Sequence, residues 1–248
     1  YHVKGGLNQI NHKMADLIEK NGGKIHLNSP VEEIIVDRGV AKGLRVNGEA
    51  ILFDEVIVNA DFSYAMHKLI KPEHLKKYTP QKLDKMKYSV STFMLYIGLD
   101  KEYDFDHHEI LFSKDYENYL KGLTQDQFTD DFSIYLHNPG RTDDSYAPKG
   151  HTSLFVLVPV PNLRANQNWE TYKHHLKEKA LDLIESKHHV DLRSHIQVMK
   201  MLDPTDWEKE YNVHLGAVFN LAHNLPQMLH RRPQNQFNDI KHLYLVGG

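Results

Sequence analysis

Strand-like and helix-like segments follow one another along this chain without regular βαβ alternation, and this order constrains the fold more than any other feature. Near the start, residues 31–36, 40–46 and 50–53 are rich in apolar side chains and are separated by Asp37-Arg38-Gly39 and Asn47-Gly48. Asn-Gly between two apolar runs is a strong hairpin signal. The three segments predict an antiparallel meander, and the mixed order predicts an α+β fold, or an α/β fold in two parts.

The segments that flank this meander follow the same rules. Apolar residues at helical spacing predict a helix over residues 7–18, closed by a run of Asn and Gly. Residues 24–27 are predicted to form a further short strand, and residues 54–59 a buried strand that ends in a polar residue. Ala60-Asp61 then lead into a helix that ends at Leu69.

A second region begins near Lys71-Pro72. Residues 88–99 carry the strongest strand pattern in the chain because β-branched and aromatic side chains crowd it. The same signals predict further strands at 110–112, 133–136, 152–158, 196–202 and 243–246, and helices at 169–186 and 203–211. We therefore expect a second sheet, mixed or antiparallel, with helices that cover it.

Charge and composition exclude several functions. The 30 Lys and Arg residues and 33 Asp and Glu residues give a net charge of −3, which offers no electrostatic basis for wrapping a nucleic acid. The absence of Cys excludes a disulfide framework, a thiolate nucleophile and a zinc site built on sulfur. No apolar run approaches the ~20 residues of a membrane span.

Histidine is the compositional outlier, with 18 residues that include the pairs His107-His108, His174-His175 and His188-His189. His174 and Glu178 are four residues apart on a predicted helix, but no metal-binding signature surrounds them, so we expect surface histidines and no metal site. The chain also has no Gly-x-Ser-x-Gly and no Gly-x-Gly-x-x-Gly. These patterns identify no catalytic residue.

The order of several short segments carries a family resemblance. They are Lys4-Gly5-Gly6-Leu7, residues 28–36, Val56-Ile57-Val58-Asn59-Ala60-Asp61, residues 93–100, Asp203-Pro204-Thr205-Asp206-Trp207, Gly216-Ala217-Val218-Phe219 and Arg232-Pro233-Gln234-Asn235. In this order they resemble the FAD-dependent amine-oxidase-like superfamily. Within it they are most similar to the carotenoid desaturases that act on phytoene or dehydrosqualene.

The resemblance implies a division of the chain. Residues 1–62 would belong to an FAD-binding domain, residues 63–235 to a substrate-binding domain, and residues 236–248 to the strand that returns to the FAD-binding domain. The family's N-terminal dinucleotide motif and the Thr-His-Pro-Gly stretch after the last strand are absent from this sequence. We therefore expect a C-terminal fragment that by itself is inactive and binds FAD weakly or not at all.

The same resemblance assigns a few cofactor-binding residues. The backbone of Val31 would meet the adenine end of the flavin nucleotide, although a plain strand position in the core explains Val31 equally well. Asn59 and Ala60 would close the strand that returns to the flavin sheet. Gly247 and Gly248 would begin the loop near the isoalloxazine, where a missing Cβ permits close backbone approach.

The implied activity is the desaturation of a long isoprenoid polyene. One carbon loses a hydride to the flavin, and the adjacent carbon loses a proton. A hydrocarbon offers no polar handle, so the substrate site should be a long apolar tunnel. We expect the strands at 88–99 and 152–158 to form its walls, with Phe93 and Leu95 as substrate contacts. The expected partners are this substrate and a membrane surface, with no nucleic acid and no metal.

Other readings stay open at this point. The chain could belong to an amine or porphyrinogen oxidase or a carotenoid terminal oxidase, which share the fold. It could also be a flavin-free module that binds an apolar ligand. The resemblance implies a cytoplasmic location, with peripheral contact to the inner face of the cell membrane left open.

Overall fold

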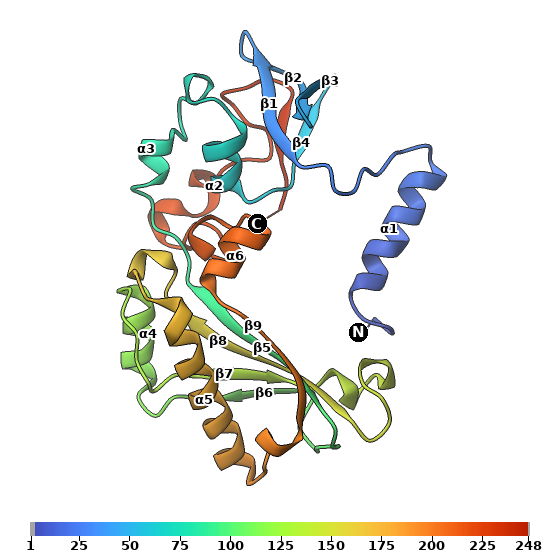
Figure 1. Cartoon of the computed structure of the whole chain (residues 1–248). Helices are drawn as coiled ribbons and strands as arrows, with labels where there is room; N and C mark the ends of the chain where they lie inside the picture. Colours follow the sequence, from blue (N-terminus) through green and yellow to red (C-terminus); the bar gives the residue numbers. More distant parts are fainter. Residues whose placement is uncertain (1–2, 248) are drawn as a thin grey trace. The chain divides into compact units, whose positions relative to one another are not determined.

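The computed structural model describes residues 3–247, and the contacts within it divide the chain into two compact units (Figure 1). The first, here called the sheet unit, comprises the residues up to His26 together with Thr92–Pro204. The second, called the cleft unit, comprises Leu27–Ser91 and the residues from Thr205 onward. Each unit has a hydrophobic core of its own.

A five-stranded sheet organises the sheet unit, with strand order β6-β7-β8-β5-β9 (Figure 1). The strands are β5 (Ser91–Leu99), β6 (His108–Leu111), β7 (Ile134–His137), β8 (Thr152–Val160) and β9 (Ile196–Leu202). β7 pairs with β6 and with β8, and β5 pairs with β9, all antiparallel. The expected second sheet is confirmed.

Two helices, α4 (Tyr116–Thr124) and α5 (Trp169–His188), cover one face of this sheet (Figure 1). Alternation along the strands separates the two faces, as the period of two requires. On β8, Leu154 and Val156 are fully buried, whereas Phe155 is half-buried on the other side. From α5, Leu176 and Ile184 enter the same core.

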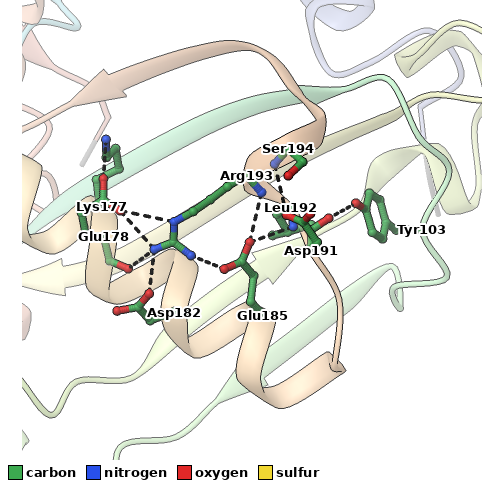
Figure 2. Close-up of polar contacts among 9 residues, drawn as sticks. All are labelled: Tyr103, Lys177, Glu178, Asp182, Glu185, Asp191, Leu192, Arg193 and Ser194. Carbon is green, nitrogen blue, oxygen red and sulfur yellow. Dashed lines mark hydrogen bonds and ion pairs between the residues drawn. The ribbon is translucent and has the colours of Figure 1, made fainter.

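A charged network around Arg193 fastens the end of α5 to the chain that leads into β9 (Figure 2). The Arg193 guanidinium contacts the carboxylates of Glu178, Asp182 and Glu185, with the first two at 3.1 and 2.7 Å. The carboxylate of Glu185 also accepts the backbone N–H of Leu192 at 2.8 Å and of Arg193 at 3.0 Å. One arginine and one glutamate therefore fix the connection between helix and strand.

The first helix, α1 (Asn8–Lys20), is amphipathic and buries none of its side chains in the described structure. Its apolar stripe is exposed over Leu7, Met14 and Leu17. Before the helix, the backbone N–H of Gly5 donates to the Asp143 carboxylate at 2.8 Å.

Two small sheets build the cleft unit. The predicted meander is present as β1 (Val31–Asp37), β2 (Val40–Val46) and β3 (Glu49–Leu52). A parallel pair joins β4 (Val56–Val58) to β10 (Leu243–Leu245), residues that lie nearly 200 positions apart. The core between them draws Ile34 from the meander together with apolar side chains that include Phe62, Met66, Leu83, Ala217, Leu221 and Ile240.

The remaining elements are short. The helices are α2 (Phe62–Tyr64), the π-helical turn Ala65–Leu69, α3 (Pro80–Leu83) and α6 (Pro204–Tyr211). The 3-10 turns are Pro72–His74, Pro139–Arg141, Asp144–Tyr146, Leu163–Ala165, Arg193–His195, His214–Gly216, Leu225–Gln227 and Leu229–Arg231. None of the helices among residues 3–247 combines the length and the apolar character needed to cross a bilayer.

The mixed α/β fold is confirmed, and some local elements differ from the predictions. Residues 24–27 form no strand. Helix α4, capped by the Asp115 side chain on the Asn118 N–H, was not predicted. Residues 63–91 and 205–235 share a core with β4 and β10 in the cleft unit, and the division into FAD-binding and substrate-binding domains at 62/63 and 235/236 stays a prediction.

Candidate functional site

The parallel pair of the cleft unit places two chain segments at one edge. β4 continues into Asn59-Ala60-Asp61, and β10 continues into Val246-Gly247. The backbone N–H of Val246 donates to the carbonyl of Val58 at 3.0 Å, which holds the two exits side by side. The carboxyl ends of parallel strands are where ligands bind in open α/β sheets.

A cleft of about 690 Å³ opens at this edge. The residues that line it come from the two strand exits, from the start of α2, from the segment after α6 and from the turn before β10. They include Asn59, Ala60, Asp61, Tyr211, Phe219, Asn220, Leu229, Arg232, Asn235 and Gly247. Its volume lies in the range of about 300–1,000 Å³ that small-molecule and cofactor sites occupy.

Gly247 lies very close to the side chain of Asn59 in this cleft. Its φ of +85° lies in the left-handed region that favours glycine. A Cβ at this position would lie 2.6 Å from Oδ1 of Asn59, closer than any real contact allows. A side chain at position 247 would therefore displace the Asn59 side chain from its place in the cleft.

Asp61 orders the floor of the cleft. Its Oδ1 accepts the backbone N–H of Tyr64 at 2.8 Å and so caps α2, and its Oδ2 accepts the side-chain amide of Asn220 at 3.1 Å. Burial raises the pKa of the Asp61 carboxyl, while backbone N–H groups oppose part of that rise. The carboxylate thus serves as a fixed acceptor that ties residues 159 positions apart.

The opposite wall is held by side-chain contacts to backbone groups. Arg232 donates from Nη1 to the carbonyl of Leu221 at 3.2 Å. The side-chain amide of Asn235 donates to the carbonyl of Leu245 at 2.9 Å, and the Asn235 carbonyl accepts the Leu245 N–H at 2.7 Å. The Arg232 guanidinium therefore enters the cleft wall from a segment that is anchored to β10.

The structure brings together part of the predicted cofactor set. Asn59, Ala60 and Gly247 all line the cleft. Val31 does not line it: it begins β1, is half-buried and pairs with Val46. Gly248 lies outside the described residues. The cofactor roles of these residues stay predictions, since no contact to a ligand is available to test them.

Phe93 and Leu95, the predicted substrate contacts, are fully buried in the core of the sheet unit. They face the side that the helices cover, so they pack against protein. Met94 and Tyr96 point to the opposite face of β5 and are half-buried. The strand β5 was predicted from sequence, but which of its faces the helices cover was not.

That opposite face carries apolar side chains around Tyr96 and Phe155, with Lys200 of β9 directly opposite Tyr96. The rings of Tyr96 and Phe155 meet edge to face with centroids 5.2 Å apart, and Val198 is exposed on β9. A hollow of about 430 Å³ lies here, lined by Tyr96, Gly98, Tyr146, Pro148 and Val198 among others. The sheet unit therefore offers an apolar surface of its own, on the side away from α4 and α5.

Sequence reasoning assigned no role to Asp61, Asn220 or Arg232. The segments 56–61 and 232–235 were among those that carried the family resemblance. Asp61 and Arg232 were therefore noted in the sequence, but no function was assigned to them. No feature of the sequence marked Asn220. Its left-handed φ of +61° is known only from the structure. Outside the cleft, two groups of side chains within residues 3–247 have metal-ligand spacing: His107, His108 and His137, and His67, Asp84 and His214.

Comparison with known proteins adds the family. The description "Flavin containing amine oxidoreductase" fits residues 1–247. The 4,4'-diapophytoene desaturase (4,4'-diapolycopene-forming) of Methylomonas sp is 47% identical over 251 residues, which cover 100% of this chain and 49% of that protein. The all-trans-zeta-carotene desaturase of Myxococcus xanthus is 37% identical over 254 residues, covering 100% of this chain and 48% of that protein. The chain therefore spans about half the length of these curated relatives.

The fold is shared with solved oxidoreductases. A crystal structure of an oxidoreductase from Methanosarcina mazei matches with a TM-score of 0.65 and 18% identity, over 98% of this chain and 49% of that one. At this identity the match shows the fold alone. The family description, in contrast, fits nearly every residue, including both strand exits that form the cleft. This chain belongs to the flavin containing amine oxidoreductase family.

Proposed function

We propose that this chain forms the substrate-binding part, and a portion of the FAD-binding part, of an FAD-dependent desaturase of long isoprenoid polyenes. The observation that carries the proposal is the cleft at the carboxyl ends of β4 and β10, where Gly247 meets Asn59. The names of the relatives supply the reaction class, because they are desaturases of diapophytoene and zeta-carotene.

The cleft residues fit a dinucleotide cofactor. Backbone at Ala60 and Gly247 is open to a ligand, since Ala60 is exposed and Gly247 has no side chain. Arg232 offers a guanidinium suited to a phosphate oxygen. When bound, FAD would supply the redox chemistry by accepting hydride from the substrate. We propose that Asn59, Ala60 and Gly247 hold part of it, and that Asp61 keeps the two segments of the cleft in place.

The substrate belongs on the open face of the sheet unit in this proposal. A polyene is recognised by apolar side chains alone, and Tyr96, Phe155 and Val198 present such a surface. Phe93 and Leu95 remain part of the same wall, as the packing behind it. Met94 and Tyr96, which alternate with them, make the proposed contacts to the substrate.

The test uses the full-length protein, assayed for bound flavin and for conversion of a thirty-carbon dehydrosqualene-type substrate in lipid vesicles. We expect a flavin absorption band and products with longer conjugation, separated by chromatography with absorbance detection. Turnover of amines or porphyrinogens in place of the polyene would select an oxidase, and oxygenated polyene products would select a terminal oxidase. A folded full-length protein that contains no flavin would favour the alternative of a flavin-free module that binds an apolar ligand. The 248-residue chain expressed alone should retain far less flavin.

Because the substrate is a lipid, we further propose that the protein docks peripherally on a membrane. Leu225 and Leu229 are 84% and 80% exposed, and Arg231 is exposed beside them. Exposed leucines next to a cationic side chain suit an interface with anionic lipid. Leu229 also lines the cleft.

Sedimentation of the full-length protein with vesicles that contain anionic lipid tests this contact. The double variant Leu225→Asp/Leu229→Asp should lose most of the bound fraction, because it replaces apolar contacts by charges that the lipid repels. Ile51→Asp/Leu52→Asp, a pair exposed on β3, is the matched control and should keep its binding. Equal loss in both would contradict the assignment.

A further inference from the structure

Three histidines from two strands meet at one end of the sheet in the sheet unit. His107 and His108 lie at the start of β6, and His137 ends β7. His108 and His137 are direct partners in the antiparallel register, and the N–H of Asn138 donates to the carbonyl of His107 at 3.1 Å. Backbone pairing therefore fixes all three positions before any side chain is considered.

The ring nitrogens converge. One nitrogen from each of the three rings lies within 4.8 Å of the others. Nε2 of His107 and Nε2 of His137 are 3.2 Å apart. Two nitrogen ligands at about 2.0–2.1 Å from a tetrahedral ion are themselves ~3.3 Å apart. The two rings are within hydrogen-bond distance of each other, and the same separation is compatible with a shared ion that replaces this hydrogen bond.

Hydroxyl groups orient two of the rings from behind. Nδ1 of His107 contacts Oγ1 of Thr142 at 2.8 Å, and Nδ1 of His108 contacts the Tyr135 hydroxyl at 2.6 Å. A hydroxyl that accepts Nδ1–H selects the tautomer whose Nε2 carries a lone pair. Metal-binding histidines are positioned in this way by their outer partners.

The second group, His67, Asp84 and His214, differs in its donor set. Nδ1 of His67 contacts the carbonyl of Ser63 at 2.7 Å, and its Nε2 contacts the Asp84 carboxylate at 3.0 Å. Asp84 belongs to the same group, so this group offers two imidazoles and one carboxylate in place of three imidazoles. This group serves as a control.

We propose that His107, His108 and His137 form a binding site for one divalent transition-metal ion of the Zn²⁺ class, distinct from the cleft. Three imidazoles suit Zn²⁺, Cu²⁺ and Ni²⁺ and select against Mg²⁺ and Ca²⁺, which prefer oxygen. The fourth position is open to water, because His108 is exposed. A bound ion ties the start of β6 to the end of β7.

Metal-free, full-length protein, purified without a histidine tag, tests the site by titration calorimetry with ZnCl₂ and by the visible spectrum with CoCl₂. We expect one equivalent of tight binding and the intense bands of tetrahedral Co²⁺. The double variant His107→Gln/His137→Gln should abolish both. Thr142→Val keeps all three ligands and should weaken Zn²⁺ binding by about 10- to 100-fold.

Two controls separate this site from the other histidines. His174→Gln/His175→Gln removes an adjacent pair on α5, and His67→Gln removes a histidine of the second group; both variants should bind Zn²⁺ like the parent. Circular dichroism establishes that each variant is folded. Because His108 is exposed, His108→Ala removes one proposed ligand without changing the core. Absence of a stoichiometric site in the parent overturns the proposal, as does binding that survives in folded His107→Gln/His137→Gln or His108→Ala protein.

Discussion

The two units of this chain reach their cores by different routes. In the sheet unit, one five-stranded sheet and two helices enclose a continuous apolar cluster built from alternating strand residues. In the cleft unit, a three-stranded meander and a two-stranded parallel pair share a core with short turns and helices drawn from both ends of the chain. Both cores are apolar, but the core of the cleft unit joins segments from both ends of the chain, and polar contacts such as Asp61 to Asn220 add to that connection.

The difference shows in which faces stay open. The sheet unit covers one face with α4 and α5 and leaves an apolar face beside Tyr96 and Phe155. The cleft unit leaves open the carboxyl ends of its parallel strands, and Ile57 on β4 is 65% exposed although parallel strands are normally buried on both faces. We propose the first opening for a hydrocarbon and the second for a polar cofactor, and four variants test that contrast.

The largest effect is expected from Phe93. Phe93→Ala removes a fully buried ring, and the cavity should lower the free energy of unfolding by about 3–5 kcal/mol. Tyr96→Ala, three residues along β5 on the open face, should cost far less stability but should reduce polyene conversion. Denaturant unfolding and product analysis of both variants measure the two effects. Similar stability losses in the two would contradict the assignment of the faces.

A smaller effect, confined to the cofactor, is expected from Gly247. Gly247→Ala places a Cβ against Asn59 Oδ1, and we expect flavin affinity to fall by at least about tenfold, equivalent to ~1.4 kcal/mol. Gly39→Ala is the matched control, since Gly39 has a φ of +75° and nothing within 4 Å of an added Cβ. Flavin content per folded chain is the measurement. Equal flavin loss in both variants would assign the effect to backbone strain instead of the cleft.

The Arg193 network should contribute an intermediate amount of stability to the sheet unit. Arg193 is partly exposed, so Arg193→Ala should lower the free energy of unfolding by only ~1–2 kcal/mol, and the loss should shrink in 1 M salt. Arg193→Lys should recover less than half, because an ammonium cannot bond three carboxylates with the geometry of a guanidinium. Full recovery with lysine, measured by chemical denaturation, would show that charge alone matters.

Asp61→Asn should give the smallest change in the free energy of unfolding, and the size of that change should depend on pH. Burial raises the folded-state pKa of Asp61 above its ordinary value, so the folded protein binds the proton more tightly and this contribution to stability is lost as pH rises above about 3.8. The variant lacks this pH-dependent contribution but also loses an acceptor for Asn220. The stability difference between parent and Asp61→Asn should therefore narrow from pH 4 to pH 7. A difference that widens with pH would contradict the direction of the shift.

Sequence reasoning identified local elements well and their assembly less well. The meander was predictable because Asn47-Gly48 encodes its turn within a few residues. Helix α4 was missed because only a short run with one capping Asp115 marks it. The strand at 24–27 was predicted from apolar residues that, without a pairing partner, stay irregular. The cleft residues Asn59, Ala60 and Gly247 were named through family resemblance and not through a chemical pattern.

The sequence by itself determined the mixed α/β class, the meander, the strand β5 and the family, because all of these are encoded in short-range order. Only the tertiary structure decided that Phe93 and Leu95 face the helices, that Asp61 reaches Asn220, and that His107, His108 and His137 converge. The physical reason is that local propensity fixes the direction of each side chain relative to its own strand. Which neighbour then covers that side depends on the free energy of packing summed over distant segments.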